Sequence, residues 1–169
     1  MDKEALLLLV QEKLRAEFGG GFISSELMAD YPVFVLNRDI ICDAVRFLYN
    51  DEELSFQFLT NLAGLHYPDN KGQELGVMYQ LHNLRKNYRI RLKVFFNINE
   101  PDVPSITPVF KGANWMERQE FDFFGINFTG HPNLKRILNM DDMTYYPMRK
   151  EFPLEDGTRE DKDDKMFGR

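Results

Sequence analysis

The sequence predicts an α+β fold in two layers, with helices on one side of a mixed or antiparallel sheet of about five strands and an extended C-terminal arm. One reason is the order of its patterned segments, which runs helix, strands, helix, three strands and helix. The other is composition, because 43% hydrophobic residues, with fifteen Phe among them, are enough for one core. A chain of 169 residues suits one domain, predicted over 1–139, with the arm and an acidic tail over 140–169.

The first third of the chain alternates between helical and extended patterns. The predicted segments are a helix over 2–18, strands over 22–27 and 32–36, and a helix that follows Asn37 and runs through Tyr49. Leu6, Leu9, Val10 and Leu14 share one face of the first helix, and three glycines at 19–21 end it. Asn37 is a suitable N-cap for the second helix, because its side chain can accept a hydrogen bond from a free backbone N–H.

Three further segments are predicted to form an antiparallel meander. They cover residues 55–61, 74–84 and 88–97. The first contains Phe56 and Phe58 and is predicted to be a central strand. The third alternates between apolar and basic residues, with Ile90, Leu92, Val94 and Phe96 on one side and Arg89, Arg91 and Lys93 on the other. One face of this strand should therefore lie on the core and the other in water or on a partner.

The stretch over 114–154 mixes aromatic rings, charges of both signs, Gly and Pro more densely than any other part of the chain. A helix is predicted to begin at Asn114, which can cap it. It should end at Gly125, because a glycine followed by an apolar residue is typical of a left-handed helix stop. Several residues share one broad face of this helix: Met116, Glu120, Phe121 and Phe124.

The segments on either side of this helix are predicted to be non-helical. Residues 100–108 hold three prolines and are predicted to be a loop. His131, Tyr146 and Phe152 each precede a proline, which favours extended backbone. The tail over 155–169 has six acidic and four basic residues and almost nothing apolar, so it cannot form a core. The helix therefore leads into an extended, charged and aromatic ribbon.

Charged residues lie among the aromatic side chains of the predicted helix: Glu117, Arg118, Glu120 and Asp122. A charge in such dehydrated surroundings needs a partner, because removing one member of a buried pair costs roughly 3–5 kcal/mol. Arg118 and Asp122 are one turn apart and could pair with each other. They could also pair with Arg136 and Asp141 further along the chain. The pattern favours a structural ion network over a pair of acid and base carboxylates.

Composition argues against several classes of function. The net charge of −6 disfavours a general nucleic-acid binder. Cys42 is the only cysteine, so the sequence offers no internal disulfide and no cysteine-ligated zinc or iron–sulfur site. His66, His82 and His131 are far apart, which disfavours a metal site. The longest apolar run, over 5–10, is too short to cross a bilayer and does not resemble a signal peptide, so we expect a soluble, cytosol-facing protein.

Three motifs in order, W-x-E-R-x-x-x-D-x-x-G, H-P-x-L-x-R-I-L and P-x-R-K-x-F-P-L, closely resemble the 30-kilodalton subunit (the C subunit) of respiratory complex I, the proton-pumping NADH:quinone oxidoreductase. The matching residues are Trp115, Glu117, Arg118, Asp122, Gly125, His131, Pro132, Leu134, Arg136, Ile137, Leu138, Pro147, Arg149, Lys150, Phe152, Pro153 and Leu154. One departure is Gln119, where the family usually has Glu. It bears on any role that needs a negative charge at that position.

The resemblance implies a non-catalytic structural subunit with a similar two-layer fold. Such a protein sits in the peripheral arm of the complex and braces the quinone-cavity subunit, beside neighbouring iron–sulfur subunits. The chain itself is expected to carry no catalytic residue, cofactor site or metal site, whereas the complex uses NADH, FMN, iron–sulfur clusters and quinone. It is expected on the cytoplasmic side of the bacterial inner membrane, held there through the complex, with no membrane span and no nucleic acid.

Two groups of residues are predicted to carry this structural role. The network is expected to comprise Trp115, Glu117, Arg118, Asp122, Gly125, His131 and Arg136. The partner interface is expected to comprise Tyr145, Tyr146, Arg149, Lys150 and Phe152, which include residue types enriched at interface cores and hot spots. For the basic pair in that group, docking on an acidic groove and plain solvation both stay open. The arm and tail over 140–169 are expected to lie on partner subunits.

Two other functions stay open at this point. The chain could be the equivalent subunit of a related complex that oxidises ferredoxin or reduced deazaflavin, or of a membrane-bound hydrogenase. It could instead be a stand-alone enzyme in which Glu117 and Asp122 act as acid and base. In that case purified chain would turn over a substrate unaided.

Overall fold

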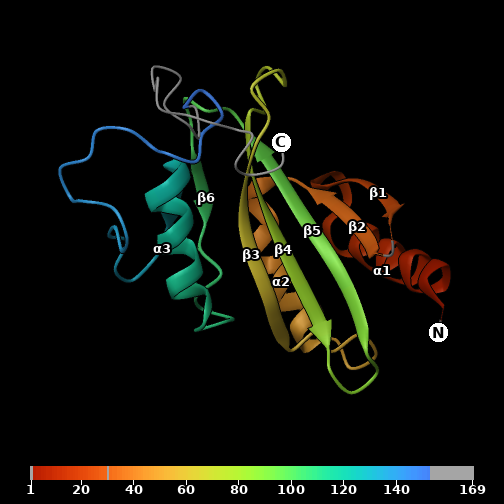
Figure 1. The fold of residues 1–169 in the computed structure, drawn as a ribbon. Coiled ribbons are helices and arrows are strands. Elements are labelled where there is room, and N and C mark those ends of the chain that lie inside the picture. The colour runs from red at the N-terminus through yellow and green to blue at the C-terminus, as the bar shows by residue number, and fades with distance from the viewer. Residues whose placement is uncertain (1, 30, 153–169) are drawn as a thin grey trace, which may run out of the picture.

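A five-stranded mixed sheet forms the centre of the protein, whose computed structural model describes residues 2–29 and 31–152 (Figure 1). The strands lie in the order β1-β2-β5-β4-β3, with β2 parallel to β5 and the other neighbours antiparallel. The helices and strands are, in chain order, α1 (Lys3–Phe18), β1 (Phe22–Met28), β2 (Tyr31–Leu36), α2 (Ile41–Asn50), β3 (Phe58–His66), β4 (Leu75–Asn83), β5 (Tyr88–Phe96), β6 (Asp102–Pro104), α3 (Ala113–Phe124) and β7 (Asn127–Thr129). The predicted α+β class is confirmed. The acidic tail over 155–169, with Pro153 and Leu154 of the third motif, lies outside the described residues.

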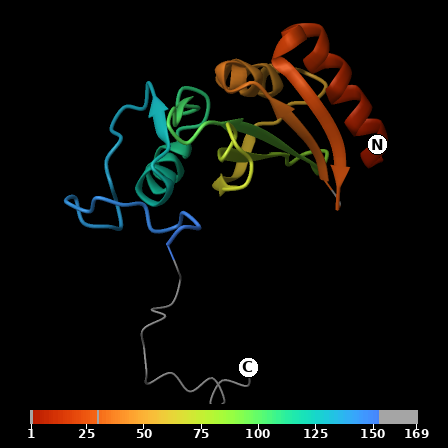
Figure 2. The same cartoon turned by 90° about the horizontal axis from the view of Figure 1, so that it is seen from above.

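Helices α1 and α2 cover one face of the sheet, as Figures 1 and 2 show from two directions. Asp2 caps α1 by accepting a hydrogen bond from the Ala5 backbone N–H at 2.7 Å. Of the four residues predicted for one face of α1, Leu6, Val10 and Leu14 are buried, whereas Leu9 is only half-buried. In α2 the residues that enter the core are Ile41, Ala44, Val45 and Leu48. Asn37 caps the 3₁₀ turn that leads into α2, since its side chain accepts from the Asp39 backbone N–H at 3.1 Å.

The predicted meander of β3, β4 and β5 is confirmed, but the position of β3 is not. This strand lies at one edge of the sheet rather than in its centre, and it begins at Phe58. Ser55 adopts a positive φ of 45°, which breaks the extended run. Phe56 is fully buried in the loop before the strand, and its N–H bonds to the Leu48 carbonyl. The aromatic pattern around this residue thus marks the core and not a strand.

The prediction of a loop over 100–108 was wrong for its central part. Residues of β6 pair in parallel with β7, which follows α3, so the two short strands join the segments before and after the helix. The Asn127 N–H bonds to the Pro101 carbonyl and the Ser105 N–H bonds to the Thr129 carbonyl, both at 2.9 Å. A short edge strand such as β6 can contain a proline, because the backbone N–H that proline lacks is not needed on the unpaired side of the strand.

Helix α3 lies along the free edge of β3, beyond the face that α1 and α2 cover (Figure 2). Asn114 lies inside this helix, which begins at Ala113 without a side-chain cap, so the predicted capping role of Asn114 was wrong. The stop at Gly125 is confirmed, with φ 73° and ψ 30°, and Ile126 just after it is fully buried. Within the described parts of the chain, no helix is both long and apolar enough to span a membrane.

Candidate functional site

Asp122 is the centre of a buried polar network that joins α3 to the ribbon after β7. Its fully buried carboxylate accepts a hydrogen bond from Arg136 Nη1 at 2.8 Å and another from Asn139 Nδ2 at 3.0 Å. It also accepts from the backbone N–H groups of Ile137, Leu138 and Asn139, at 3.2, 2.9 and 2.9 Å. The ribbon therefore wraps around one anion on the helix.

The Asp122 carboxyl is ionised in this setting. Burial alone would raise its pKa, because a charged group loses its hydration. The hydrogen bonds from Asn139, Leu138 and Arg136 outweigh that effect and hold the pKa of Asp122 well below its usual range. Arg136 also donates to the carbonyls of Asp122 and Met143, at 3.1 and 2.8 Å. The guanidinium thus carries three contacts that all hold the ribbon in place.

Arg118 supports the same ribbon through hydrogen bonds to its backbone carbonyls. Its Nε donates to the Lys135 carbonyl at 3.0 Å and its Nη2 to the Arg136 carbonyl at 3.2 Å. The guanidinium carbon lies 5.0 Å from the centroid of the Trp115 ring, which is 64% exposed. Of the pairings that sequence spacing left open, the structure contains the one between Asp122 and Arg136.

Glu117 is fully buried and joins α3 to the segment just after β6. It accepts from Ser105 Oγ at 2.6 Å and from the Ile106 backbone N–H at 2.8 Å. Burial raises the pKa of Glu117 to about 7, although both hydrogen bonds act in the opposite direction. Glu117 therefore connects the helix to the segment before it, and Asp122 connects the helix to the ribbon after it.

His131 is held as a neutral ring. Its Nδ1 accepts from the Asn133 backbone N–H at 3.0 Å, so the proton is on Nε2, which donates to the Asn114 carbonyl at 3.1 Å. Burial lowers the pKa of His131 and the nearby charge of Arg118 adds to this, against the opposing effect of the Asn114 carbonyl. Nε2 lies 4.0 Å from Oε2 of Glu117, with both side chains fully buried. The ring packs the start of α3 against the ribbon.

Glu120 contacts the edge strand β3, an interaction that no sequence motif predicted. Its carboxylate accepts from the Gly64 backbone N–H of β3 at 2.7 Å. A Cβ atom at Gly64 would collide with Glu120 and with the Phe124 ring, so the glycine allows the close approach of the helix. Burial raises the pKa of Glu120 to about 7, against the hydrogen bonds from Gly64 and Gln119. The clue in the sequence was a carboxylate on the otherwise apolar face of the helix.

The arm returns to cover the C-terminal end of α3. Arg149 Nε donates to the Phe124 carbonyl at 2.8 Å, and the Met148 N–H donates to the Phe123 carbonyl at 3.2 Å. The Tyr146 ring lies against Gly125, with the guanidinium carbons of Arg136 and Arg149 at 5.3 and 4.7 Å from its centroid. Tyr146 and Arg149, predicted for a partner interface, thus have contacts within the chain.

The remaining residues predicted for the interface are more open. The Lys150 N–H donates to His66 Nδ1 at 3.0 Å, and its ammonium lies 5.4 Å from the centroid of the Tyr67 ring. The rings of Tyr145 and Phe152 are 5.0 Å apart and remain 45% and 38% exposed. Three other large apolar side chains of this segment are exposed as well, and we call the five together the arm patch: Leu138, Met140, Tyr145, Met148 and Phe152. Among the residues that the structure describes, no group of three or more His, Cys, Asp or Glu side chains is placed to hold a metal ion.

Comparison with known sequences gives relatives that share one name. The chain is 44% identical over 121 residues to the C subunit of NADH-quinone oxidoreductase from Nocardioides sp., a match that covers 72% of this chain and 48% of that protein. It is 43% identical over 146 residues to the C subunit of NADH-quinone oxidoreductase from Roseiflexus sp., covering 86% of this chain and 83% of that protein. The match thus spans about half the length of the first relative and most of the second.

Comparison with solved structures gives the same fold. A trypsin-resistant fragment of Nqo5 matches with a TM-score of 0.64 and 30% identity, over 76% of this chain and 98% of the fragment. A chain of a membrane-bound sulfane sulfur reductase, an archaeal respiratory membrane complex, matches with a TM-score of 0.71 over 89% of this chain and 85% of that one. At 21% identity, the second likeness is one of fold alone.

The family model described as "Respiratory-chain NADH dehydrogenase, 30 Kd subunit" matches residues 34–158, which include α3, its whole polar network and the arm. This match confirms the resemblance that the three motifs carry. The chain therefore belongs to the family of the 30-kilodalton subunit of respiratory-chain NADH dehydrogenase.

Proposed function

We propose that this chain is a non-catalytic structural subunit in the peripheral arm of a proton-pumping NADH:quinone oxidoreductase, where it braces the quinone-cavity subunit. The observation that carries the proposal is a buried polar network that anchors a segment with exposed apolar side chains. Asp122 and Arg136 fix the start of the ribbon, and Arg149 fixes its end against α3. Residues 130–152 contain no helix or strand, so these contacts are what anchor the arm patch to α3.

A pre-formed apolar surface suits permanent docking. Large exposed apolar patches on a soluble domain mark sites where another protein binds, and ordering them beforehand reduces the entropy lost on association. The arm patch adds aromatic rings and methionines, which are enriched in interface cores. In this proposal the core is 1–139, and the arm and tail over 140–169 lie on the quinone-cavity subunit and on neighbouring iron–sulfur subunits.

The carboxylates of α3 support a structural role better than a catalytic one. Both oxygens of Asp122 and both oxygens of Glu117 accept hydrogen bonds from groups of this chain. An acid or base must instead present an oxygen to a substrate within hydrogen-bonding distance. We therefore assign NADH, FMN, iron–sulfur clusters and quinone to other subunits. In the same proposal, the partner subunits hold the chain on the cytoplasmic side of the inner membrane.

The equivalent subunit of a related complex is the second candidate. A chain of an archaeal sulfane sulfur reductase has a similar fold, so this fold also occurs in another kind of respiratory membrane complex. The names of the sequence relatives, at 43–44% identity, favour the NADH-dependent complex.

Purification of the tagged chain from its native membranes in mild detergent, followed by mass spectrometry, tests the proposal. We expect recovery of a quinone-cavity subunit, iron–sulfur subunits, membrane subunits and the NADH-oxidising subunits. Recovery without the NADH-oxidising subunits would favour the second candidate. A chain recovered alone and monomeric, and active on a substrate unaided, would contradict both.

A further inference from the structure

A row of basic side chains lies on the face of the sheet that the helices leave open. On β5 the residues Ile90, Leu92 and Val94 are fully buried, so Arg89, Arg91 and Lys93 between them point away from α1 and α2. Within residues 2–29 and 31–152, none of the three basic side chains is in an ion pair. Among the described residues, therefore, these three positive charges have no ionic partner, on a chain whose net charge is −6.

The residues directly beside Arg91 and Lys93 are neutral, and the nearest carboxylate that the structure describes on this face is that of Glu26, one strand further out opposite Val33. The residues that pair with Arg91 and Lys93 on the two adjoining strands are Val33, Val35, Gln80 and Met78. The Arg91 guanidinium carbon lies 4.4 Å from the centroid of the Tyr31 ring, and Lys93 Nζ lies 3.8 Å from Met28 Sδ. The surface therefore combines positive charge with aliphatic and aromatic flanks.

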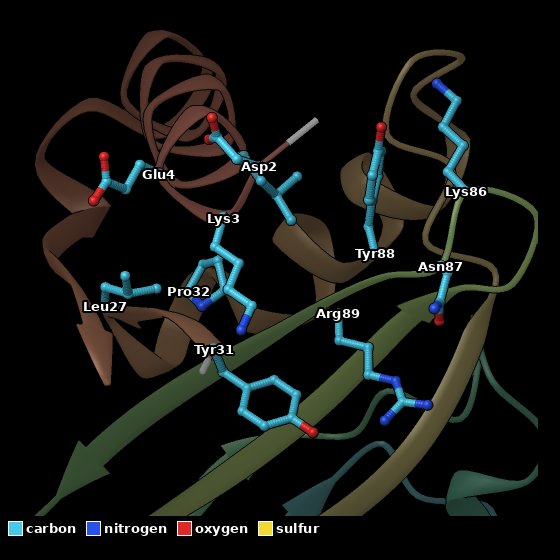
Figure 3. Close-up of a pocket in the computed structure, with 11 residues that line it drawn as sticks. Asp2, Lys3, Glu4, Leu27, Tyr31, Pro32, Lys86, Asn87, Tyr88 and Arg89 are labelled. Carbon is cyan, nitrogen blue, oxygen red and sulfur yellow. The ribbon is translucent and has the colours of Figure 1, made fainter. Parts of the chain in front are cut away.

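A groove continues this surface at Arg89. It has a volume of about 1040 Å³ and lies between the start of α1, the β1–β2 hairpin and the β4–β5 turn. Figure 3 shows Tyr31 and Arg89 at one side of the groove, the carboxylates of Asp2 and Glu4 at the start of α1, and Lys86 and Tyr88 at the β4–β5 turn. The hydrogen bond and charge of Arg89 lower the pKa of Tyr31, in keeping with positive potential at this point.

We propose that this basic sheet face, together with the groove, docks an acidic segment of another subunit, whose carboxylates pair with Arg89, Arg91 and Lys93. Guanidinium groups match carboxylates in geometry, and the neutral flanks suit the aliphatic side chains of a protein segment. This second contact rests on the assembly proposed above but uses a different surface. Figure 1 shows α3 and the arm at one end of the molecule, while β2 and β5 lie toward the other.

Zero-length carbodiimide cross-linking of the intact complex, read by mass spectrometry, identifies the carboxylate directly. We expect Lys93 to couple to an Asp or Glu of another subunit. Coupling to the chain's own acidic residues over 155–164, or to a second copy, would overturn the proposal. The proposal would also be overturned if Lys93 did not couple and if an acetylating reagent modified its amine equally in the free chain and in the complex. Failure of the chain to co-purify with any other protein of the complex would instead contradict the proposed function.

Charge reversal gives the second test. Arg89→Glu with Lys93→Glu should lower the amount of chain retained in the complex about tenfold at moderate salt, with an unchanged melting temperature of the isolated chain. The matched control, Arg15→Glu with Arg46→Glu, makes the same change in net charge on the helices of the opposite face and should be retained like the original. Equal retention of both variants would overturn the proposal.

Discussion

Arg136 Nη1 lies 2.8 Å from Oδ1 of Asp122, and the two side chains are 10% and 0% exposed. The pair joins the last turn of α3 to the ribbon that follows β7. Because the same carboxylate also accepts backbone N–H groups of that ribbon, the ion pair and the loop conformation depend on one another. The position of the arm patch therefore depends on the contacts between Asp122, Arg136 and the ribbon.

Replacing Asp122 by Asn should destabilise the chain by roughly 3 kcal/mol, because Arg136 is left as a buried charge without its partner. Urea unfolding of the isolated chain measures this difference. Asp141→Asn removes an equal charge from an exposed position on the same ribbon and should change the free energy of unfolding by less than about 0.5 kcal/mol. Equal effects of the two substitutions would contradict the role assigned to the pair.

Stability should depend on pH through Glu120. Its folded-state pKa of about 7 lies above its ordinary value of 4.5, so the folded chain holds a proton that the unfolded chain releases between these values. The free energy of unfolding from this group is therefore greatest below about pH 4.5 and falls as pH rises through 7. His131, with a lowered pKa, works in the opposite direction below pH 6.5.

The comparison of Glu120→Gln with the original chain isolates the Glu120 effect from that of His131 and from that of Glu117, whose pKa burial also raises to about 7. Between pH 5 and pH 8 the variant should gain roughly 2 kcal/mol relative to the original chain, since an amide keeps an oxygen for the Gly64 N–H and does not ionise. Urea unfolding at several pH values measures the gain. A difference that is constant with pH would show that the Glu120 carboxyl titrates normally.

Local patterns in the sequence predicted much of the fold, because the forces behind them act over a few residues. The alternation along β5, the cap at Asn37 and the left-handed stop at Gly125 each depend on neighbours within one or two turns. The motifs also marked Asp122 and Arg136 as parts of one structure.

The missed features depend on contacts between distant residues. Gly64 and Glu120 are 56 residues apart, and only the folded chain brings the helix to the edge of β3. Phe56 is a residue type common in strands, but the positive φ of Ser55 just before it breaks the extended run, and the Phe56 side chain is buried in the core. β6 and β7 are separated in the chain by the whole of α3, and their pairing depends on how that helix folds back. The local sequence around β6, which is rich in proline, therefore did not indicate a strand.

Gly125→Ala should cost more than a positive φ alone explains. A left-handed residue other than glycine is strained by roughly 1–2 kcal/mol, and here the added Cβ would also collide with the Tyr146 ring. Gly130→Ala is the matched control, because Gly130 has φ 80° with open space around it. We expect the free energy of unfolding to drop by at least about 1 kcal/mol more for the first variant. Equal costs would mean that Tyr146 does not pack on this turn.

Arg149→Ala should loosen the arm from the end of α3. It removes the hydrogen bond to the Phe124 carbonyl and the stacking on Tyr146, so we expect a loss of about 1–2 kcal/mol in stability. Hydrogen exchange of the Met148 N–H, which bonds to the Phe123 carbonyl, should become faster. Lys135→Ala changes an exposed basic residue of the same ribbon and should leave both measurements unchanged. Unaltered exchange at Met148 in Arg149→Ala would argue against an anchoring role.

The most direct measurement of the docking role is the amount of chain that stays in the complex when the arm patch carries a charge. Phe152→Asp and the control Leu8→Asp place the same charge at exposed apolar positions on the arm patch and on α1. After purification through another subunit, we predict that retention of Phe152→Asp falls about tenfold while Leu8→Asp is retained fully. Full retention of Phe152→Asp, with normal quinone reductase activity of the complex, would contradict docking through the arm.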